Sequence, residues 1–132
     1  MAVAAGPVAE EVTYAAQHLT VADLRDNAAY LKSQPGSANQ KPAALAATSP
    51  LMQQGANVYQ ANCSACHNSD GRGIPQLAAG LRDNPGIMAA DSSSVITTIL
   101  EGGRGAVTLN NPTSGAMPSF AWKLSDQQIA AV

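Results

Sequence analysis

The stretch Cys63-Ser64-Ala65-Cys66-His67 decides how the rest of the sequence is interpreted. It holds both cysteines of the chain and one of its two histidines. A structural zinc site takes four ligands, yet the chain has no further cysteine and His18 lies 45 residues upstream of Cys63. A redox dithiol normally opens a helix after a strand in a βαβ pattern, and no such pattern surrounds this stretch. Both interpretations therefore fit the sequence poorly.

Covalent haem attachment is the interpretation that uses all three side chains, because C-x-x-C-H is the c-type attachment motif. Each thiol adds to a vinyl group of the porphyrin, and His67 is delivered to the proximal face of the iron. The composition agrees, since 45% of the 132 residues are hydrophobic but only 4% are aromatic. A domain this small usually needs large side chains to fill its core. We therefore expect the haem itself to form the hydrophobic centre.

Haem iron needs a second axial ligand or an open site, and Met117 is the best candidate for the ligand. It lies 50 residues after His67, between Gly115-Ala116 and Pro118. Pro118 biases Met117 towards an extended conformation, which suits a segment that crosses the distal face of a haem. We assign Met52 and Met88 to ordinary packing, the usual role of methionine.

Charge and hydropathy exclude two classes of partner. Seven Lys and Arg against nine Asp and Glu form no basic surface of the kind that binds nucleic acid. No apolar run approaches the ~18 residues needed to span a bilayer. Charged residues are 12% of the chain, which is too few for a solvated disordered protein.

The motif Cys63-x-x-Cys66-His67, followed by Met117-Pro118-x-Phe120, resembles a class I cytochrome c domain. Gly55-x-x-x-Tyr59-x-x-x-Cys63 resembles the first helix of that fold. The resemblance implies an all-α fold of small helices wrapped around one covalent haem c. It implies electron transfer rather than enzymatic catalysis, with His67 and Met117 as axial ligands. It also implies that the first helix packs against the last.

Three further segments, at residues 70–73, 100–105 and 116–126, carry a narrower resemblance. They are similar to the last haem domain of the multihaem cytochrome subunit of membrane-bound, quinoprotein alcohol-type dehydrogenases. That resemblance implies a relay domain whose partners are a quinone-cofactor dehydrogenase subunit and a quinone or oxidase acceptor. It places the domain in the periplasm or on the outer face of the cytoplasmic membrane, with membrane contact only through the complex.

Several residues are candidates for the haem pocket, each with a plainer alternative. The Pro75 carbonyl is a candidate acceptor for the second nitrogen of His67, although Pro75 also suits a simple turn. Arg104 and Arg72 suit the haem propionates, or are solvated loop arginines. Phe120 and Trp122 suit the porphyrin edge, or ordinary packing.

Helical spacing predicts helices over residues 51–66 and 92–100, and a third that starts at Ser125 with a capping box to Gln128. Leu19-Thr20-Val21-Ala22-Asp23-Leu24 resembles the segment from Leu124 to Ile129, which indicates an internal repeat. We predict that residues 1–35 are the helical tail of a preceding cytochrome-like domain without its haem motif. Residues 36–50 are then a linker, and residues 51–132 a haem domain whose last helix is truncated.

Two alternatives and one expectation about the chain's origin remain. In the first alternative Met117 only packs, and the chain is a c-haem enzyme or a gas- or peroxide-binding protein with an open distal site. In the second the two thiols form a haem-free redox or metal-binding module. The N-terminus lacks the basic start of a secretory signal, so we expect the chain to be a fragment.

Overall fold

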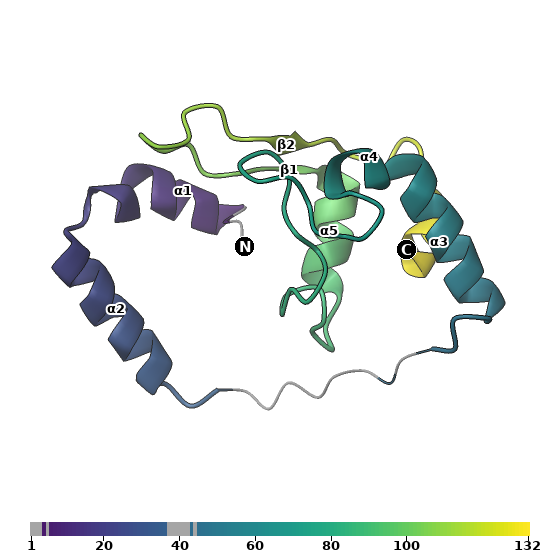
Figure 1. Cartoon of the computed structure of the whole chain (residues 1–132), viewed down its shortest axis with the longest axis horizontal. Helices are drawn as coiled ribbons and strands as arrows, with labels where there is room; N and C mark the ends of the chain where they lie inside the picture. The colour runs from purple at the N-terminus through teal and green to yellow at the C-terminus, as the bar shows by residue number, and fades with distance from the viewer. Residues whose placement is uncertain (1–3, 5, 37–42, 44) are drawn as a thin grey trace.

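The computed structural model of the chain describes residues 4, 6–36, 43 and 45–132 (Figure 1). The fold is mostly helical, as predicted, with one short two-stranded hairpin added. None of the described helices is both long enough and apolar enough to cross a membrane. The elements in chain order are α1 (Pro7–Tyr14), η1 (Ala16–His18), α2 (Val21–Ser33), α3 (Pro50–Asn62), α4 (Ser64–His67), α5 (Ser93–Glu101), β1 (Gly103–Arg104), β2 (Ala116–Met117) and α6 (Asp126–Ala131).

The helix predicted over residues 51–66 is two helices that meet at Cys63. Ser49 caps α3 by accepting a hydrogen bond from the Met52 N–H, and Pro50 occupies the first turn. Cys63 has φ −116°, outside the helical range, and this turns the chain into the single turn of α4. The side chains of Asn62 and Ser64 donate to carbonyls four residues earlier, a bond that bends helices. The bend leaves Cys63 at the junction and places Cys66 and His67 on a separate short turn.

The side-chain core lies where α3 crosses α6. Val58, Leu124 and Ile129 are its buried members, and Ile99, Leu100 and Phe120 pack against them. Gly55 is buried at the crossing, and a Cβ atom at this position would lie 2.0 Å from the Ala131 carbonyl oxygen. The crossing therefore requires glycine at residue 55. The expected packing of the first helix against the last is confirmed.

α5 connects this core to the hairpin. Its first residue is Ser93 and its N-cap is Ser92. Asp91 Oδ1 accepts the Ser93 N–H at 2.8 Å. The Ile99 carbonyl accepts the Phe120 N–H at 2.9 Å, which ties the segment after β2 to the helix. The hairpin itself, inside the loop predicted over residues 102–122, pairs Gly103 with Met117 and Arg104 with Ala116.

The N-terminal helices lie to one side of this unit (Figure 1). Thr20 and Asp23 form a capping box at the start of α2, and Ser125 and Gln128 form the same box at the start of α6. Every residue of α2 is exposed, including Tyr30 and Leu31. Residues 37–42 and 44 of the predicted linker lie outside the described residues.

The capping box of α2 makes the helix sensitive to acid. Hydrogen bonds from the Thr20 hydroxyl and N–H lower the pKa of the Asp23 carboxyl. The ionised form therefore stabilises the helix above the unfolded pKa of about 3.9, and this stabilisation is lost as the pH falls through the lower folded value. We expect Asp23→Ala to lower the helical far-UV circular dichroism at neutral pH and to remove this step from an acid titration. Asp26→Ala in the same helix is the control, and an unchanged acid titration in Asp23→Ala contradicts the assignment.

Candidate functional site

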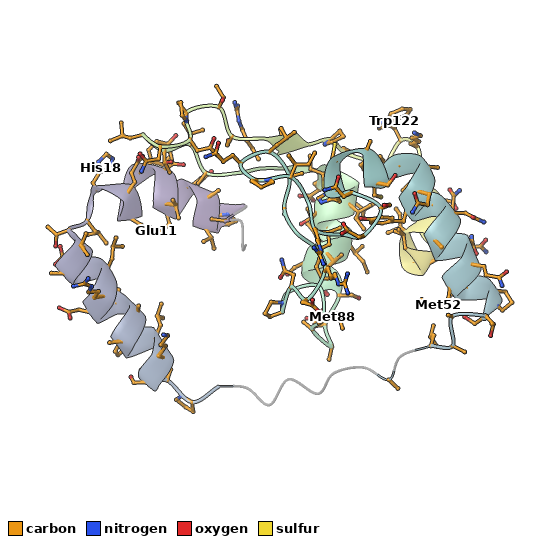
Figure 2. The ribbon with its side chains drawn as sticks, in the orientation of Figure 1. Glu11, His18, Met52, Met88 and Trp122 are labelled. Atoms are coloured by element: carbon orange, nitrogen blue, oxygen red, sulfur yellow. The ribbon has the colours of Figure 1, made fainter. Side chains whose placement is uncertain are left out.

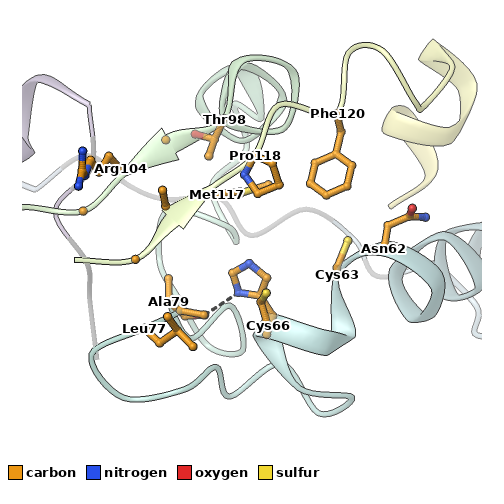
Figure 3. A pocket seen from close by; sticks show the side chains of 16 residues that line it. Asn62, Cys63, Cys66, Leu77, Ala79, Thr98, Arg104, Met117, Pro118 and Phe120 are labelled. Carbon is orange, nitrogen blue, oxygen red and sulfur yellow. Dashed lines mark hydrogen bonds between the residues drawn. The ribbon is translucent and has the colours of Figure 1, made fainter. Parts of the chain in front are cut away.

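A cavity of about 250 Å³, open to solvent on one side, lies between α4, α5 and the hairpin (Figure 3). Its lining residues are mostly apolar or glycine, and Arg104 is the charged residue among them. They are Asn62, Cys63, Cys66, His67, Leu77, Ala78, Ala79, Thr98, Gly103, Arg104, Gly105, Gly115, Ala116, Met117, Pro118 and Phe120. The two cysteines, His67 and Met117, predicted from separate motifs, therefore share one cavity.

The imidazole of His67 is held by a backbone carbonyl on one wall of this cavity. Its Nδ1 lies 2.8 Å from the Ala79 carbonyl oxygen (Figure 3). A carbonyl can only accept, so Nδ1 carries the proton and Nε2 is left as the free lone pair. The prediction that Pro75 supplies this carbonyl is wrong. Pro75 is exposed and does not line the cavity, because the loop continues four residues further before it returns to the ring.

A chain of hydrogen bonds fixes the loop that brings Ala79 to the ring. Tyr59 Oη donates to the Asn68 carbonyl at 2.6 Å, and Asn68 Nδ2 donates to the Gly73 carbonyl at 2.6 Å. The Gly73 N–H in turn donates a hydrogen bond to the His67 carbonyl at 2.9 Å. Gly73 has φ +71°, and a Cβ there would lie 2.5 Å from the Ala79 oxygen. Tyr59, part of the predicted first-helix motif, thus anchors the loop after the histidine.

Both cysteine thiols are free and reach the same end of the cavity (Figure 3). Cys63 is half-buried at the end of α3, and Cys66 is exposed on α4. Burial raises the pKa of the Cys63 thiol, and the neighbouring Cys66 adds to the effect. The Cys63 side chain therefore remains a neutral thiol at neutral pH.

Met117 lies on β2 and lines the same cavity as His67 (Figure 3). Two glycines, Gly102 and Gly115, let the hairpin backbone lie close to neighbouring backbone segments. Gly102 has φ +78°, and a Cβ on it would lie 2.5 Å from the Met117 carbonyl oxygen. A Cβ on Gly115 would lie 1.9 Å from the Leu77 oxygen, so the hairpin closes directly onto the loop that carries Ala79.

The remaining sequence candidates divide into two groups. Arg104 and Phe120 line the cavity, as predicted for pocket residues. Trp122 does not, because it is 80% exposed and its indole N–H donates to the Ser119 carbonyl at 3.0 Å. Arg72 is also outside the lining and pairs with Asp70 at 3.2 Å.

Met52 and Met88 are 41% and 40% exposed, and neither lines the cavity (Figure 2). Met117 is thus the one methionine of the described residues that reaches it. The ordinary packing assigned to the other two is not observed, because both side chains are exposed.

The donor set fits a covalent haem better than a metal ion. No three His, Cys, Asp or Glu side chains gather into a metal site within the described part of the chain. Two thiols at one end, an oriented imidazole and a thioether across an apolar space are the groups that a c-type haem requires. The small side-chain core, with three buried hydrophobic residues in the described part of the chain, is also what a domain built around a prosthetic group needs.

Known proteins with similar sequences agree with this arrangement. The chain is 36% identical to the cytochrome c subunit of the quinone alcohol dehydrogenase of Gluconobacter oxydans, over 96% of this chain and 28% of that protein. It is 33% identical to the gluconate 2-dehydrogenase cytochrome c subunit of Pantoea cypripedii, over 96% of this chain and 31% of that one. It is also 33% identical to cytochrome c4 of Thiocapsa roseopersicina, over 93% of this chain and 62% of that protein.

The chain thus spans less than a third of the length of the two dehydrogenase subunits. Residues 52–132 match the cytochrome c family. That match covers more than half of the chain and contains the whole cavity. This chain belongs to the cytochrome c family.

Proposed function

We propose that this chain is an electron-transfer domain whose Cys63 and Cys66 hold one haem c by thioether bonds, with His67 and Met117 as axial ligands. The observation that carries the proposal is that His67, Met117 and both cysteines line one mostly apolar cavity. When bound, the haem supplies an iron centre that takes up and releases one electron. The residues of the chain determine how readily it does so.

The two axial side chains act by filling both open positions of the iron. The Nδ1 bond to Ala79 fixes the imidazole ring and raises the basicity of Nε2. Met117 contributes a neutral thioether, which donates weakly to the ferric state and so favours the ferrous state. The apolar lining further disfavours the extra charge of the ferric state. No ligand has to leave or enter when an electron arrives, which suits a relay.

Arg104 and Phe120 complete the pocket in this proposal. Arg104 lines the cavity while its residue remains exposed, so its guanidinium can pair with a haem propionate at the solvent edge. Phe120 lines the same cavity next to Pro118 and contacts the side-chain core. It supplies an aromatic wall that excludes water from the porphyrin.

The relatives indicate the larger assembly in which this domain acts. Two are cytochrome c subunits of dehydrogenases, and the chain aligns with them over nearly all of its length. We propose a relay in a periplasmic dehydrogenase, between a quinone-cofactor subunit and a quinone or oxidase acceptor. The haem domain is close to neutral, which favours a tethered relay over a carrier steered by charge. Its charged residues are Arg72, Arg82, Arg104, Lys123, Asp70, Asp83, Asp91, Glu101 and Asp126.

The N-terminal residues 1–35 are, in this proposal, the tail of a preceding domain of the same kind. Both α2 and α6 begin with a capping box and continue with an apolar residue four positions after the cap. In α6 this residue, Ile129, is buried against α3. Its counterpart in α2, Leu24, is 43% exposed. The exposed face of α2 therefore has the side chains needed to pack on a helix equivalent to α3.

Haem retention tests the proposal directly. We expect the parent protein, made with c-type maturation machinery, to keep its haem under denaturing conditions and to titrate as a single one-electron couple. Cys63→Ala/Cys66→Ala should lose the haem on denaturation, because no thioether remains to hold it. Ser64→Ala, between the two cysteines, is the control and should retain it. A colourless parent protein with a Cys63–Cys66 disulfide would contradict the proposal.

A further inference from the structure

The N-terminal segment Gly6–His18, which contains α1 and η1, contacts the hairpin that carries Met117. Thr13 Oγ1 accepts the Val107 N–H at 3.0 Å. Gln17 Oε1 accepts the Leu109 N–H at 3.1 Å, and Gln17 Nε2 lies 3.4 Å from the Val107 carbonyl oxygen. Figure 1 shows α1 beside the loop between β1 and β2. These bonds join residues 90 to 94 positions apart in the chain.

The contact uses one side of the N-terminal segment. Thr13 and Ala9 are four residues apart on α1, so they lie on the same helical face. Ala9 is 7% exposed, the one buried residue of that helix. Gln17 follows four residues later and also donates to the Thr13 carbonyl. Its amide offers a donor and an acceptor, so it pairs with two backbone groups of the hairpin as a neighbouring strand would.

The outer half of the hairpin is joined to the strand that carries Met117. The Gly105 N–H donates to the Gly115 carbonyl at 3.1 Å, and Ser114 Oγ donates to the Gly105 carbonyl at 2.7 Å. Beyond these bonds, Thr108 and Asn111 pair with each other and close the tip. These bonds couple the backbone near Val107 to the residues directly before β2, so we expect a displacement of Val107 to displace β2 as well.

We infer that Thr13 and Gln17 are positioning residues for Met117, because they bond the hairpin backbone at Val107 and Leu109. This inference rests on the proposed function, since it takes Met117 as the axial ligand. Both residues lie in the segment proposed as the tail of a preceding domain. The contact would therefore let the arrangement of that domain influence the reduction potential of this haem.

Amide hydrogen exchange tests the contact without reference to the iron. In the whole haem-loaded chain, Thr13→Val/Gln17→Leu should raise the exchange rates of the Val107 and Leu109 N–H groups about tenfold, because each loses its acceptor. The Gly105 N–H, bonded within the hairpin, should change less. Thr13→Ser keeps the hydroxyl and should leave exchange at Val107 as in the parent. Gln34→Leu, at the C-cap of α2, is the matched control.

Ligation by Met117 is measured as the intensity of the weak long-wavelength Met–iron absorption band during a urea titration. In Thr13→Val/Gln17→Leu this band should disappear at a lower urea concentration than in the parent. The reduction potential of the variant should also be lower than that of the parent. Unchanged exchange at Val107 and Leu109 overturns the contact. Raised exchange with an unchanged band overturns the positioning role. A parent protein without the band contradicts Met117 ligation and the positioning role with it, while the exchange data still show whether the contact exists.

Discussion

Met117→Ala is expected to abolish the long-wavelength Met–iron band, to let carbon monoxide bind the reduced protein, and to lower the reduction potential by on the order of 0.1 V. The physical reason is the loss of the thioether that favours the ferrous state. Met117 lines the cavity on the strand that faces His67. Alanine cannot reach the iron, so the sixth position opens.

The control for this change is Met88→Ala, which alters a methionine that is 40% exposed and outside the cavity. It should leave the band, the potential and the lack of carbon monoxide binding unchanged. Absorption spectra with and without carbon monoxide, together with a potentiometric titration, measure all three. An unchanged Met–iron band in Met117→Ala would show that the ligand is another residue.

Gly55→Ala is expected to destabilise the domain by about 3 kcal/mol or more, although alanine favours helices over glycine. A Cβ atom at residue 55 would lie 2.0 Å from the Ala131 carbonyl oxygen and 2.9 Å from its carbon. These are backbone atoms, so the clash can be relieved only by moving α6 away from α3. The melting temperature should fall by about 10 °C or more, given about 4–8 °C per kcal/mol in a domain of this size.

Gln54→Ala is the matched control, because Gln54 is the preceding residue of α3 and is exposed. It should change the melting temperature little, since alanine and glutamine differ slightly in helix propensity. Thermal unfolding followed by circular dichroism gives both values. A Gly55→Ala protein as stable as the parent would mean that α3 and α6 do not cross at this residue.

The parts of this fold that the sequence predicts are those in which side-chain identity carries the signal. The cysteine and histidine spacing identifies the attachment motif, and a capping hydroxyl identifies the starts of α2 and α6. Gly55 alone does not predict that α3 crosses α6. It does so only when the resemblance to class I cytochrome c domains is considered as well. The packing of α6 on α3 then follows from its apolar spacing, which buries Leu124 and Ile129.

The parts that the sequence does not predict depend on backbone atoms. The acceptor for His67 is the Ala79 carbonyl, and every residue has a carbonyl, so the residue type gives no signal. β1 and β2 have two residues each, too few for an alternating pattern to be recognised. By residue type Trp122 suits the porphyrin edge or ordinary packing, yet it is 80% exposed and its N–H donates to the Ser119 carbonyl. The contacts of Thr13 and Gln17 join distant segments, which local sequence patterns do not report.

The central claim is that His67 and Met117 together fill both axial positions of one covalent haem. The most direct test is the absorption spectrum of the haem-loaded chain, oxidised and reduced, with and without carbon monoxide. We predict a low-spin spectrum with the weak Met–iron band, unmoved by carbon monoxide. A high-spin spectrum that shifts with carbon monoxide would contradict the claim and indicate an open iron that binds ligands.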